Sequence, residues 1–494
     1  MVSTADEWAE LSSVSPLHAR VSTFIRRRIE RGEYPTHRPL PPSRLLATQL
    51  GVSRNTVQVA LQTLMDEQLV YSRPRSGIFP VATNHTKESI PQRGVDWDEL
   101  LYRIAPPVPQ IVDPEHTEYP FPFLSGQVEA RSFPTQSWLK AVGKAMSGPH
   151  LANSLGDPRE GDDPQLISAL IDEILLPRGV QATSDEVMIT VGVQQGLFLV
   201  ARALAGPGVR VAIENPGYVD AHRVFQATGA EIQLMNVDAR GAQPGSAHGA
   251  HVAYVTPSSQ HPTSVVLSPY RRHHFLEQAE NDNMVIIEDD YDAEMRLEGP
   301  PLAPMKSLDQ TGRVIYLGTF SKYLSPGLRI GFVVGHPELI DQLRRFRYFA
   351  TKTPSPMMQR ALALFIRSGD YARQLRSYRV RAQSKFEQFA QCLTRELPEF
   401  SNVLPGPRMN VWLPIPVEEH SLGGLHKPTG RQWAERARQR GALITPGSWY
   451  YAPEGAVPDT EIRVGLASIP TARIGAGVRV LAEAYRADQD SSSR

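Results

Sequence analysis

Lys322 has the most distinctive chemical setting in the sequence, because a chain of 494 residues contains only eight lysines. It lies in Gly318-Thr-Phe-Ser-Lys-Tyr-Leu-Ser-Pro-Gly-Leu-Arg329, a predicted loop between two apolar strands. An amine that condenses with an aldehyde needs an anchored, partly desolvated position near groups that bind phosphate. Thr319 and Ser321 offer hydroxyls for this purpose, and Arg329 offers a guanidinium. The string therefore predicts a Schiff-base lysine rather than a surface lysine.

A carboxylate stands at the end of a second predicted strand. Asp289 follows the apolar run 284–288 in Glu288-Asp-Asp-Tyr-Asp292. Ligands bind at the carboxyl ends of strands in open parallel sheets, which favours a functional acid over a solvated acidic turn. A carboxylate at this place can keep a pyridine nitrogen protonated, so that the ring withdraws electrons.

Weaker signals accompany these two residues. The backbone N–H groups of Gly192, Val193 and Gln194, between a predicted strand and a predicted helix, could bind a phosphate. Tyr218 could stack on a ring, and Tyr291 could hydrogen-bond a phenolic oxygen. Each tyrosine suits core packing equally well.

Arg463 is a candidate for holding the acid group of a ligand. It lies in the predicted strand Glu461-Ile-Arg-Val-Gly465. A guanidinium can hold a carboxylate through two parallel hydrogen bonds. A structural ion pair is an equally good interpretation of this residue.

The elements that must position these residues form an alternating pattern. Short Val/Ile-rich runs alternate with helix-length amphipathic segments, which is typical of a largely parallel sheet wrapped by helices. The predicted strands are 187–191, 209–213, 251–256, 284–288, 314–317 and 330–334.

The N-terminal part has a different chemistry, because residues 16–82 contain ten arginines, no lysine and four acidic residues, whereas the whole chain has no net charge. This asymmetry indicates a polyanion partner for that part alone. The polar, proline-rich stretch 83–118 that follows predicts a linker. We expect domains at 14–82 and 119–488.

The pattern of the N-terminal domain predicts a winged helix-turn-helix. Apolar residues at helical spacing predict a helix over 17–29, Ser43 is expected to cap a short helix to Leu50, and Ser53 a third helix. Two strands, 69–72 and 78–81, flank Arg73-Pro-Arg-Ser-Gly77 and predict a hairpin wing.

The third helix supplies the residue types that recognition of duplex DNA requires. Base edges are contacted from the start of such a helix, while hydroxyl and basic groups hold phosphates. A solvated basic face is the competing interpretation. The predicted DNA-binding residues are Arg44, Ser53, Arg54, Asn55, Thr56, Arg75 and Gly77.

Composition excludes several classes of protein. Cys392 is the only cysteine, so no disulfide framework or thiolate metal cluster can form within the chain, and no metal site is predicted. The N-terminus lacks the pattern of a signal peptide, and the apolar runs fall short of the roughly 20 residues that a membrane helix needs. We therefore expect a soluble, cytoplasmic protein.

The strings Leu40-Pro-Pro-Ser-Arg-Leu-Leu-Ala47, Leu50-Gly-Val-Ser-Arg-Asn-Thr-Val57 and Ser76-Gly77 resemble the GntR-type winged helix. One departure is Pro35-Thr-His37, where a Pro-Gly turn is usual. Residues 120–485 resemble fold-type I pyridoxal-phosphate aminotransferases. A GntR-type winged helix followed by an aminotransferase-like region is the arrangement of the MocR/GabR regulators, which this chain resembles.

The resemblance implies a mostly α-helical winged helix-turn-helix joined by a linker to an α/β, fold-type I aminotransferase-like domain with pyridoxal 5'-phosphate as its cofactor. It implies that Lys322 carries the cofactor, Asp289 pairs with its ring nitrogen, Tyr218 stacks on it, and Arg463 holds a ligand carboxylate. His261 stands where aminotransferases tend to place an Asn that contacts the ring oxygen. A head-to-tail homodimer is also implied.

The chain departs from the aminotransferase pattern at four places. Ser264 replaces the usual Gly in Val255-Thr-Pro-Ser-Ser-Gln-His-Pro-Thr-Ser264, and Leu155 replaces a Tyr in a loop that is one residue longer. Ile167 replaces an Arg, and Pro407-Arg-Met-Asn410 replaces Ala-Gly-Leu-His. These changes bear on ligand identity and turnover.

The sequence thus predicts a DNA-binding transcriptional regulator whose operator affinity changes with pyridoxal phosphate or with an amino-compound effector. One alternative is a working aminotransferase that carries a DNA-binding domain. Another is a large domain that has lost its cofactor and serves as a dimerisation scaffold.

Overall fold

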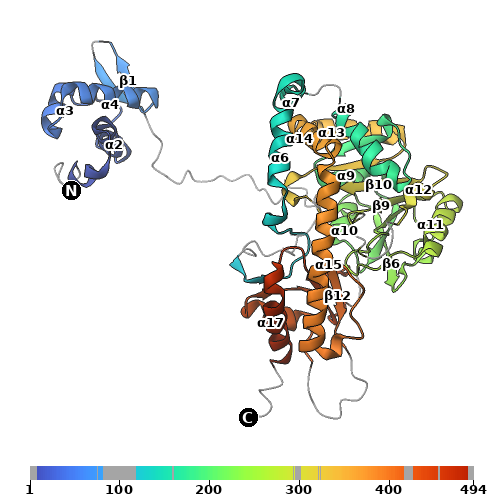
Figure 1. Ribbon diagram of the computed structural model, residues 1–494. Coiled ribbons are helices and arrows are strands. Elements are labelled where there is room, and N and C mark those ends of the chain that lie inside the picture. Colours follow the sequence, from blue (N-terminus) through green and yellow to red (C-terminus); the bar gives the residue numbers. More distant parts are fainter. Residues whose placement is uncertain are drawn as a thin grey trace, which may run out of the picture. The chain divides into compact units, whose positions relative to one another are not determined.

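The computed structural model describes residues 8–74, 76–81, 118–157, 161–292, 294, 297, 302–320, 322, 324–416, 427–453 and 457–487. The chain divides into two compact units, Met1–Tyr102 and Arg103–Arg494 (Figure 1). The predicted linker 83–118 lies almost wholly outside the described residues, and the predicted domain boundaries stay predictions.

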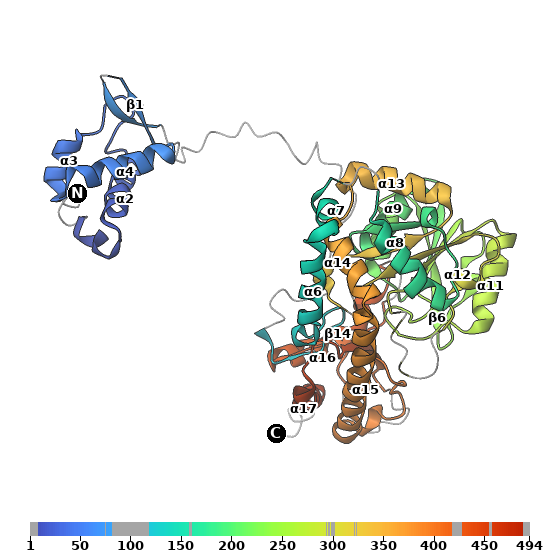
Figure 2. The same ribbon diagram turned by 45° about the horizontal axis from the view of Figure 1, so that its top comes forward.

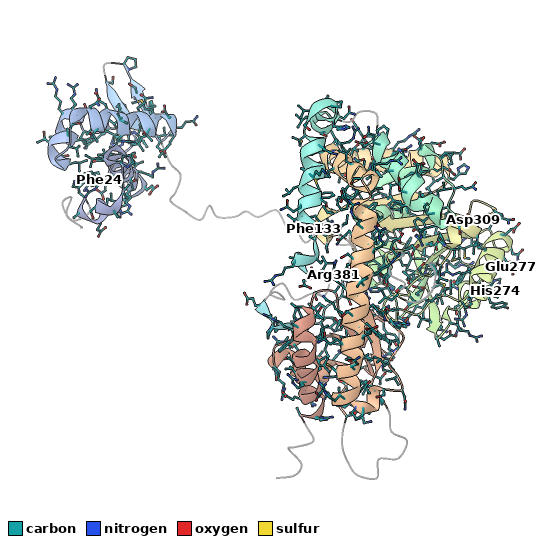
Figure 3. All side chains as sticks on the ribbon, viewed as in Figure 1. Phe24, Phe133, His274, Glu277, Asp309 and Arg381 are labelled. Atoms are coloured by element: carbon teal, nitrogen blue, oxygen red, sulfur yellow. The ribbon has the colours of Figure 1, made fainter. Side chains whose placement is uncertain are left out.

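The described part of the N-terminal unit is built mainly from α-helices and a β-hairpin, after a short 3-10 helix at Leu11–Ser13. Their bounds are α2, Leu17–Glu30; α3, Ser43–Leu50; α4, Arg54–Asp66; β1, Val70–Arg73; and β2, Gly77–Pro80. The apolar face of α2 packs on α4 around the fully buried Phe24 (Figure 3). Gly51 ends α3 with a φ of 66°, a backbone conformation that glycine adopts without strain.

Ser53 caps α4 as predicted, because its Oγ accepts a hydrogen bond of 3.0 Å from the backbone N–H of Thr56. The prediction for Ser43 was wrong. Pro42 is the residue before α3, and Ser43 is already its first helical residue, so its side chain makes no cap. Proline fits there because its fixed φ leads into the helix.

The large unit is built on an eight-stranded sheet of order β4-β11-β10-β9-β8-β5-β6-β7. Neighbours pair in parallel except around β11 and β7, which run antiparallel to the strands beside them. The strands are β4, Val187–Thr190; β5, Arg210–Asn215; β6, Glu231–Asp238; β7, Gly241–Ala242; β8, Val252–Val255; β9, Val285–Asp289; β10, Val314–Thr319; and β11, Gly331–Val334.

Helices cover both faces of this sheet, because alternate residues of each buried strand point to opposite faces (Figures 1 and 2). On one face lie α9, Gly192–Leu204; α10, Val219–Gln226; and α13, Pro337–Thr351. On the other lie α6, Thr135–Ala145; α8, Pro164–Leu170; α11, Pro269–Asn281; α12, Met305–Leu308; and α14, Pro356–Arg367. The short helix α7, Leu151–Leu155, packs beside α14.

The C-terminal part adds a three-stranded antiparallel sheet, β12-β15-β14, and a short parallel pair, β13 with β3. Their bounds are β3, Phe121–Pro122; β12, Asn410–Pro414; β13, Ala442–Leu443; β14, Thr445–Pro446; and β15, Glu461–Gly465. Helices α15, Asp370–Glu396; α16, Gly430–Gln439; and α17, Ile474–Arg486 pack with these strands. None of the helices in the described ranges is long and apolar enough to cross a membrane.

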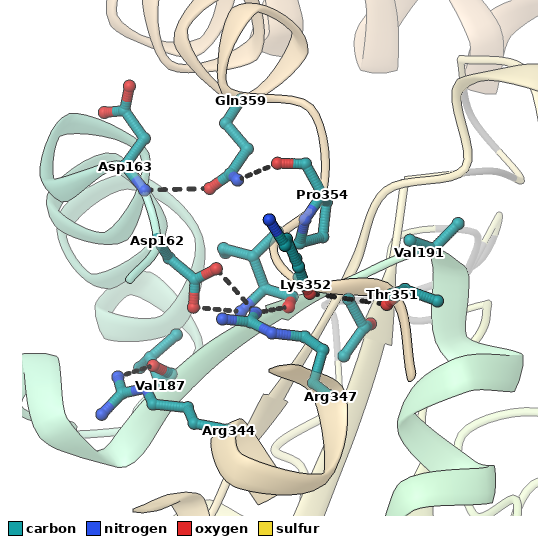
Figure 4. A network of polar contacts seen from close by, with 12 residues as sticks. Asp162, Asp163, Val187, Val191, Arg344, Arg347, Thr351, Lys352, Pro354 and Gln359 are labelled. Atoms are coloured by element: carbon teal, nitrogen blue, oxygen red, sulfur yellow. Dashed lines mark hydrogen bonds and ion pairs between the residues drawn. The ribbon is translucent and has the colours of Figure 1, made fainter. Parts of the chain in front are cut away.

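A buried ion pair fastens the segment before α8 to the central sheet (Figure 4). Asp162 lies 2.6 Å from the guanidinium of Arg347 and also accepts the backbone N–H of Ile189 in β4. Next to it, the backbone N–H of Asp163 donates to Gln359 at the start of α14. This network ties Asp162 and Asp163, just before α8, to β4, α13 and α14.

Candidate cofactor pocket and DNA-reading helix

A cavity of about 200 Å³ lies where strands β4, β8, β9 and β10 end. Most of the residues predicted for cofactor binding line it. They are Gly192, Val193, Gln194, Tyr218, His261, Asp289, Tyr291, Thr319, Lys322 and Arg329. Gly126, Tyr254, Thr256 and Pro326 complete the lining. Ser321 lies outside the described residues.

Lys322 presents its amine to this cavity. The Nζ atom lies 5.5 Å from the centre of the Tyr291 ring, and a Cβ added to Gly126 would lie 3.7 Å from it. Burial and the nearby Arg463 guanidinium lower the pKa of the amine, since both disfavour its charged form. A larger fraction of the amine is therefore neutral and nucleophilic than in an exposed lysine.

Asp289 ends β9 with its carboxyl group buried. The Tyr254 hydroxyl donates to Oδ2 at 2.6 Å, while Oδ1 is buried with no hydrogen-bond partner among the described residues. Burial raises the pKa of Asp289 to about 6, although the Tyr254 hydrogen bond opposes the shift. An acceptor that is buried and unpaired is costly, so the site suits a ligand with an N–H group.

The start of α9 forms an anion-binding corner. Gly192 has a φ of 72°, and a Cβ there would lie 3.4 Å from the guanidinium carbon of Arg329. Helix N-termini present free backbone N–H groups and a positive dipole end. Together with the hydroxyl-bearing Thr319 at the end of β10, this corner suits a phosphate group.

Arg463 lies on β15 and reaches the pocket through His261. Its Nη1 atom is 2.8 Å from Nε2 of His261, which must be the acceptor because a guanidinium only donates. Burial, with Arg463 and Lys322 nearby, holds the pKa of His261 well below its usual value, so the ring is neutral. Its proton is then on Nδ1, which has no hydrogen-bond partner among the described residues.

Aromatic rings surround this pair. The His261 ring centre lies 5.2 Å from that of Tyr218, 5.9 Å from Tyr291 and 5.3 Å from Tyr450. The Arg463 guanidinium stands 5.3 Å from the Tyr450 ring centre. The sequence analysis missed Tyr450, because nothing near it in the chain marks a site.

Most of the predicted DNA-binding residues of the N-terminal unit are exposed. Arg54 and Asn55, at the start of α4, and Arg44 in α3 are exposed. Thr56 is half-buried, in keeping with its bond to the Ser53 cap. Gly77 begins β2 with a φ of 110°. Arg75 lies outside the described residues.

Comparison with known proteins gives two family matches. The family of bacterial regulatory proteins of the gntR type matches residues 17–79, and aminotransferase class I and II matches residues 127–481. The HTH-type transcriptional regulator TauR of Rhodobacter capsulatus is 32% identical over 95% of this chain and 96% of its own length. The probable rhizopine catabolism regulatory protein MocR of Rhizobium meliloti is 31% identical over 87% of this chain and 90% of its own.

The chain belongs to the MocR-type family of HTH-type transcriptional regulators.

Solved aminotransferases share the fold of the large unit of this MocR-type chain. Kynurenine aminotransferase of Pyrococcus horikoshii superposes with a TM-score of 0.67 at 24% identity, over 82% of this chain and 97% of its own. The α-aminoadipate aminotransferase LysN of Thermus thermophilus gives 0.69 at 24% identity, over 80% and 100%. The predicted fold class, the GntR-type helix-turn-helix and the aminotransferase-like domain are confirmed.

Pyridoxal phosphate is the cofactor of this MocR-type domain. When bound, it supplies an aldehyde that condenses with amines and a pyridinium that withdraws electrons. The pocket fits this group at three points: the buried, unpaired Oδ1 of Asp289 for the ring N–H, the amine of Lys322 for the aldehyde, and the corner at Gly192 and Arg329 for the phosphate. No group of three or more His, Cys, Asp or Glu in the described part of the chain could hold a metal ion.

Two of the departures from the aminotransferase pattern contact each other. Ser264 has a φ of 59°, in the left-handed region that favours glycine, which accounts for the usual Gly. Its Oγ donates to the backbone carbonyl of Asn410 at 2.9 Å, and Arg408 donates to the Ser264 carbonyl at 2.8 Å. The altered segment 407–410 therefore offsets the cost of the serine. Leu155 is 66% exposed, and Ile167 packs in the core.

Proposed function

We propose that this regulator changes its affinity for operator DNA when an amino compound carrying an acid group occupies the pocket beside Lys322. The observation that carries the proposal is the buried cluster in which the Lys322 amine, the unpaired Asp289 oxygen and the Arg463–His261 pair meet. Pyridoxal phosphate itself is the second candidate signal. A coupling of about 1–3 kcal/mol between the two sites would change DNA affinity roughly 5- to 150-fold.

In this proposal, the predicted pocket residues hold the cofactor and the effector. Lys322 attaches the cofactor through its amine, and Asp289 pairs with the ring nitrogen. Tyr218 stacks on the ring, while Arg463, oriented by His261, holds the acid group of the effector. The remaining roles concern the polar groups of the cofactor. Its phosphate is bound by Gly192, Val193, Gln194, Thr319, Ser321 and Arg329. Its phenolic oxygen is contacted by Tyr291 and His261.

At the N-terminal unit, we propose that Arg54, Asn55 and Thr56 contact base edges in the major groove. Arg44, Ser53 and the wing residues Arg75 and Gly77 serve the DNA backbone or the minor groove. The exposure of Arg54 and Asn55 at the start of α4 supports this arrangement.

We infer that the regulator acts as a homodimer in the cytoplasm, with a head-to-tail arrangement as the resemblance implies. Large apolar side chains on the large unit support a partner of this kind, since Phe349 is 86% exposed and Leu155 66% exposed. Exposed apolar clusters mark protein interfaces more often than free surface. Light scattering of the wild type and of Phe349→Ser tests the dimer.

The deciding experiment measures DNA affinity and cofactor absorbance on the same full-length protein. Pairs of primary amines with and without an acid group are titrated against the cofactor-loaded chain, with the DNA upstream of its own coding sequence as probe. We expect acid-bearing amines to change both signals and Arg463→Ala to lose the response. If cofactor and amines leave DNA affinity unchanged, the proposal fails. Turnover with a 2-oxo acid at roughly 1–1,000 per second would instead favour a working aminotransferase.

A further inference from the structure

A second cavity, of about 520 Å³, lies between helix α10 and the segment 448–453 that follows β14. Its volume falls in the range of small-molecule sites, roughly 300–1,000 Å³. Tyr218 lines this cavity as well as the cofactor pocket. The two cavities therefore share Tyr218, and none of the other residues that line the second cavity has a predicted role.

Aromatic side chains form much of the wall. Tyr218 and the consecutive residues Trp449, Tyr450 and Tyr451 all line the cavity. Tyr450 is buried, whereas Trp449 is 39% exposed and marks the rim. Flat apolar surfaces of this kind suit a planar ring, because stacked and edge-on contacts add to the burial of apolar area.

Positive charge is concentrated at the same place. The guanidinium groups of Arg223 and Arg431 both belong to the lining. Nε of Arg431 donates to Ser448 at 3.0 Å, which orients its guanidinium. Among the described residues, Nη1 of Arg223 has no hydrogen-bond partner and lies 3.9 Å from Asp220, which is a loose ion pair.

The acidic residue in the lining, Glu214, does not cancel the positive charge of the two arginines. Glu214 already accepts hydrogen bonds from Thr256 and Gln260. Burial raises its pKa to about 7, so it is only partly ionised near neutrality. Aromatic walls and two guanidinium groups together select a flat ligand with an acid group.

We propose that this cavity is a second ligand site, separate from the cofactor pocket, and that it binds a planar aromatic carboxylate. The occupant contacts Tyr218, which also lines the cofactor pocket. The segment 448–453, which the occupant touches, is hydrogen-bonded to the turn that carries Tyr218. The Gly217 N–H donates to the Tyr450 carbonyl, and the Ala452 N–H donates to the side chain of Asn215, each at 2.9 Å. Occupancy is therefore expected to perturb the absorbance of bound pyridoxal phosphate.

The test is calorimetric titration of the full-length, cofactor-loaded protein with indole-3-carboxylate, and with indole-3-carboxamide as the neutral control. We expect one site per chain with a dissociation constant on the order of 0.1 mM, and binding of the carboxamide to be roughly tenfold weaker. Arg431→Ala should weaken the acid about tenfold. Arg440→Ala is the control. Arg440 is exposed, directly follows α16, the helix that carries Arg431, and does not line the cavity, so this variant should bind the acid as the wild type does.

Further variants locate the bound acid. Val219→Trp fills the cavity and should abolish binding, while Trp449→Phe should remove quenching of tryptophan fluorescence and keep the heat of binding. Arg463→Ala should bind the acid as the wild type does, so the test does not depend on the proposed effector site. Equal affinity for the carboxamide, no effect of Arg431→Ala, or loss of binding in Arg463→Ala would each overturn the proposal.

Discussion

The start of α4, which we propose contacts DNA and call the reading helix, is assembled in the opposite way to the cofactor pocket. Arg54, Asn55 and Thr56 are consecutive and stand at the start of one helix, held by a cap from the residue just before them. The pocket instead collects residues from position 126 to position 329, and Arg463 joins them through a hydrogen bond to His261. The first site needs only local structure, whereas the second exists only once the sheet is complete.

The two sites also differ in their effect on the stability of the folded state. Arg54 and Asn55 are exposed, so their charges and dipoles stay solvated. Asp289 and Lys322 have pKa values shifted toward their neutral forms by burial. The buried ionisable groups of the pocket therefore lower the stability of the folded state. The exposed residues of the reading helix have no such cost.

The largest expected effect is the loss of bound cofactor in Lys322→Ala, a change that concerns the pocket alone. Lys322→Ala should abolish the visible absorbance of covalently bound pyridoxal phosphate, because no other amine lines the pocket among the described residues. The melting temperature should not fall, since a buried amine is removed. Lys352→Ala is the control, because this lysine is exposed and paired with Asp157 at 3.4 Å. Absorbance that survives Lys322→Ala would assign the attachment to another residue.

Asp289→Asn should reveal the stability cost of the pocket in the cofactor-free protein. The folded pKa of about 6 lies above the unfolded value of about 3.9, so the folded state binds the proton more tightly. This contribution is fully present at acid pH and is lost as pH rises through 6. Between pH 4 and pH 8 the wild type should lose about 2 kcal/mol relative to Asp289→Asn.

Urea unfolding of both proteins at the two pH values measures this difference. Asp341→Asn is the matched control, because Asp341 is exposed in its i,i+4 pair with Arg345. A constant gap between Asp289→Asn and the wild type across this pH range would show that the carboxyl group is not buried as described.

The sequence allowed most of the local structure to be predicted. The apolar runs located β4, β8, β9 and β10 to within about two residues, because strands that are buried on both faces are nearly continuous in apolar residues. Asp289 was placed correctly at the end of a strand for the same reason. The helices of the N-terminal unit followed from spacing alone.

Contacts between distant segments could not be predicted in this way. Tyr254 donates to Asp289 across two neighbouring strands, and its own strand gives no sign of a polar role. The bond between Ser264 and the Asn410 carbonyl joins two departures that are 146 positions apart. A single sequence taken alone carries no record of such pairings, because they depend on how the elements pack.

A smaller effect is expected at the reading helix. Arg54→Ala and Asn55→Ala should each weaken operator binding roughly tenfold or more, since a good contact to a base edge contributes about 1–3 kcal/mol. Stability and cofactor absorbance should not change, because both side chains are exposed. Fluorescence anisotropy with operator and scrambled DNA measures the effect.

Arg26→Ala is the control for these two variants, because its guanidinium is paired with Glu67 at 2.5 Å and lies on another helix. If Arg26→Ala weakens operator binding as much as Arg54→Ala, the basic surface as a whole, and not the start of α4, determines affinity.

The smallest effect tests whether the reading helix depends on local structure alone. Ser53→Ala removes the acceptor for the Thr56 N–H, and loss of such a cap costs about 1 kcal/mol. Amide hydrogen exchange in the first turn of α4 should then be roughly fivefold faster, while exchange in β9 and β10 stays as in the wild type. Ser53→Asn keeps a capping oxygen and should restore protection. Faster exchange in both units of Ser53→Ala would mean that α4 is held by more than its own residues, and the contrast between a local and a global site would no longer hold.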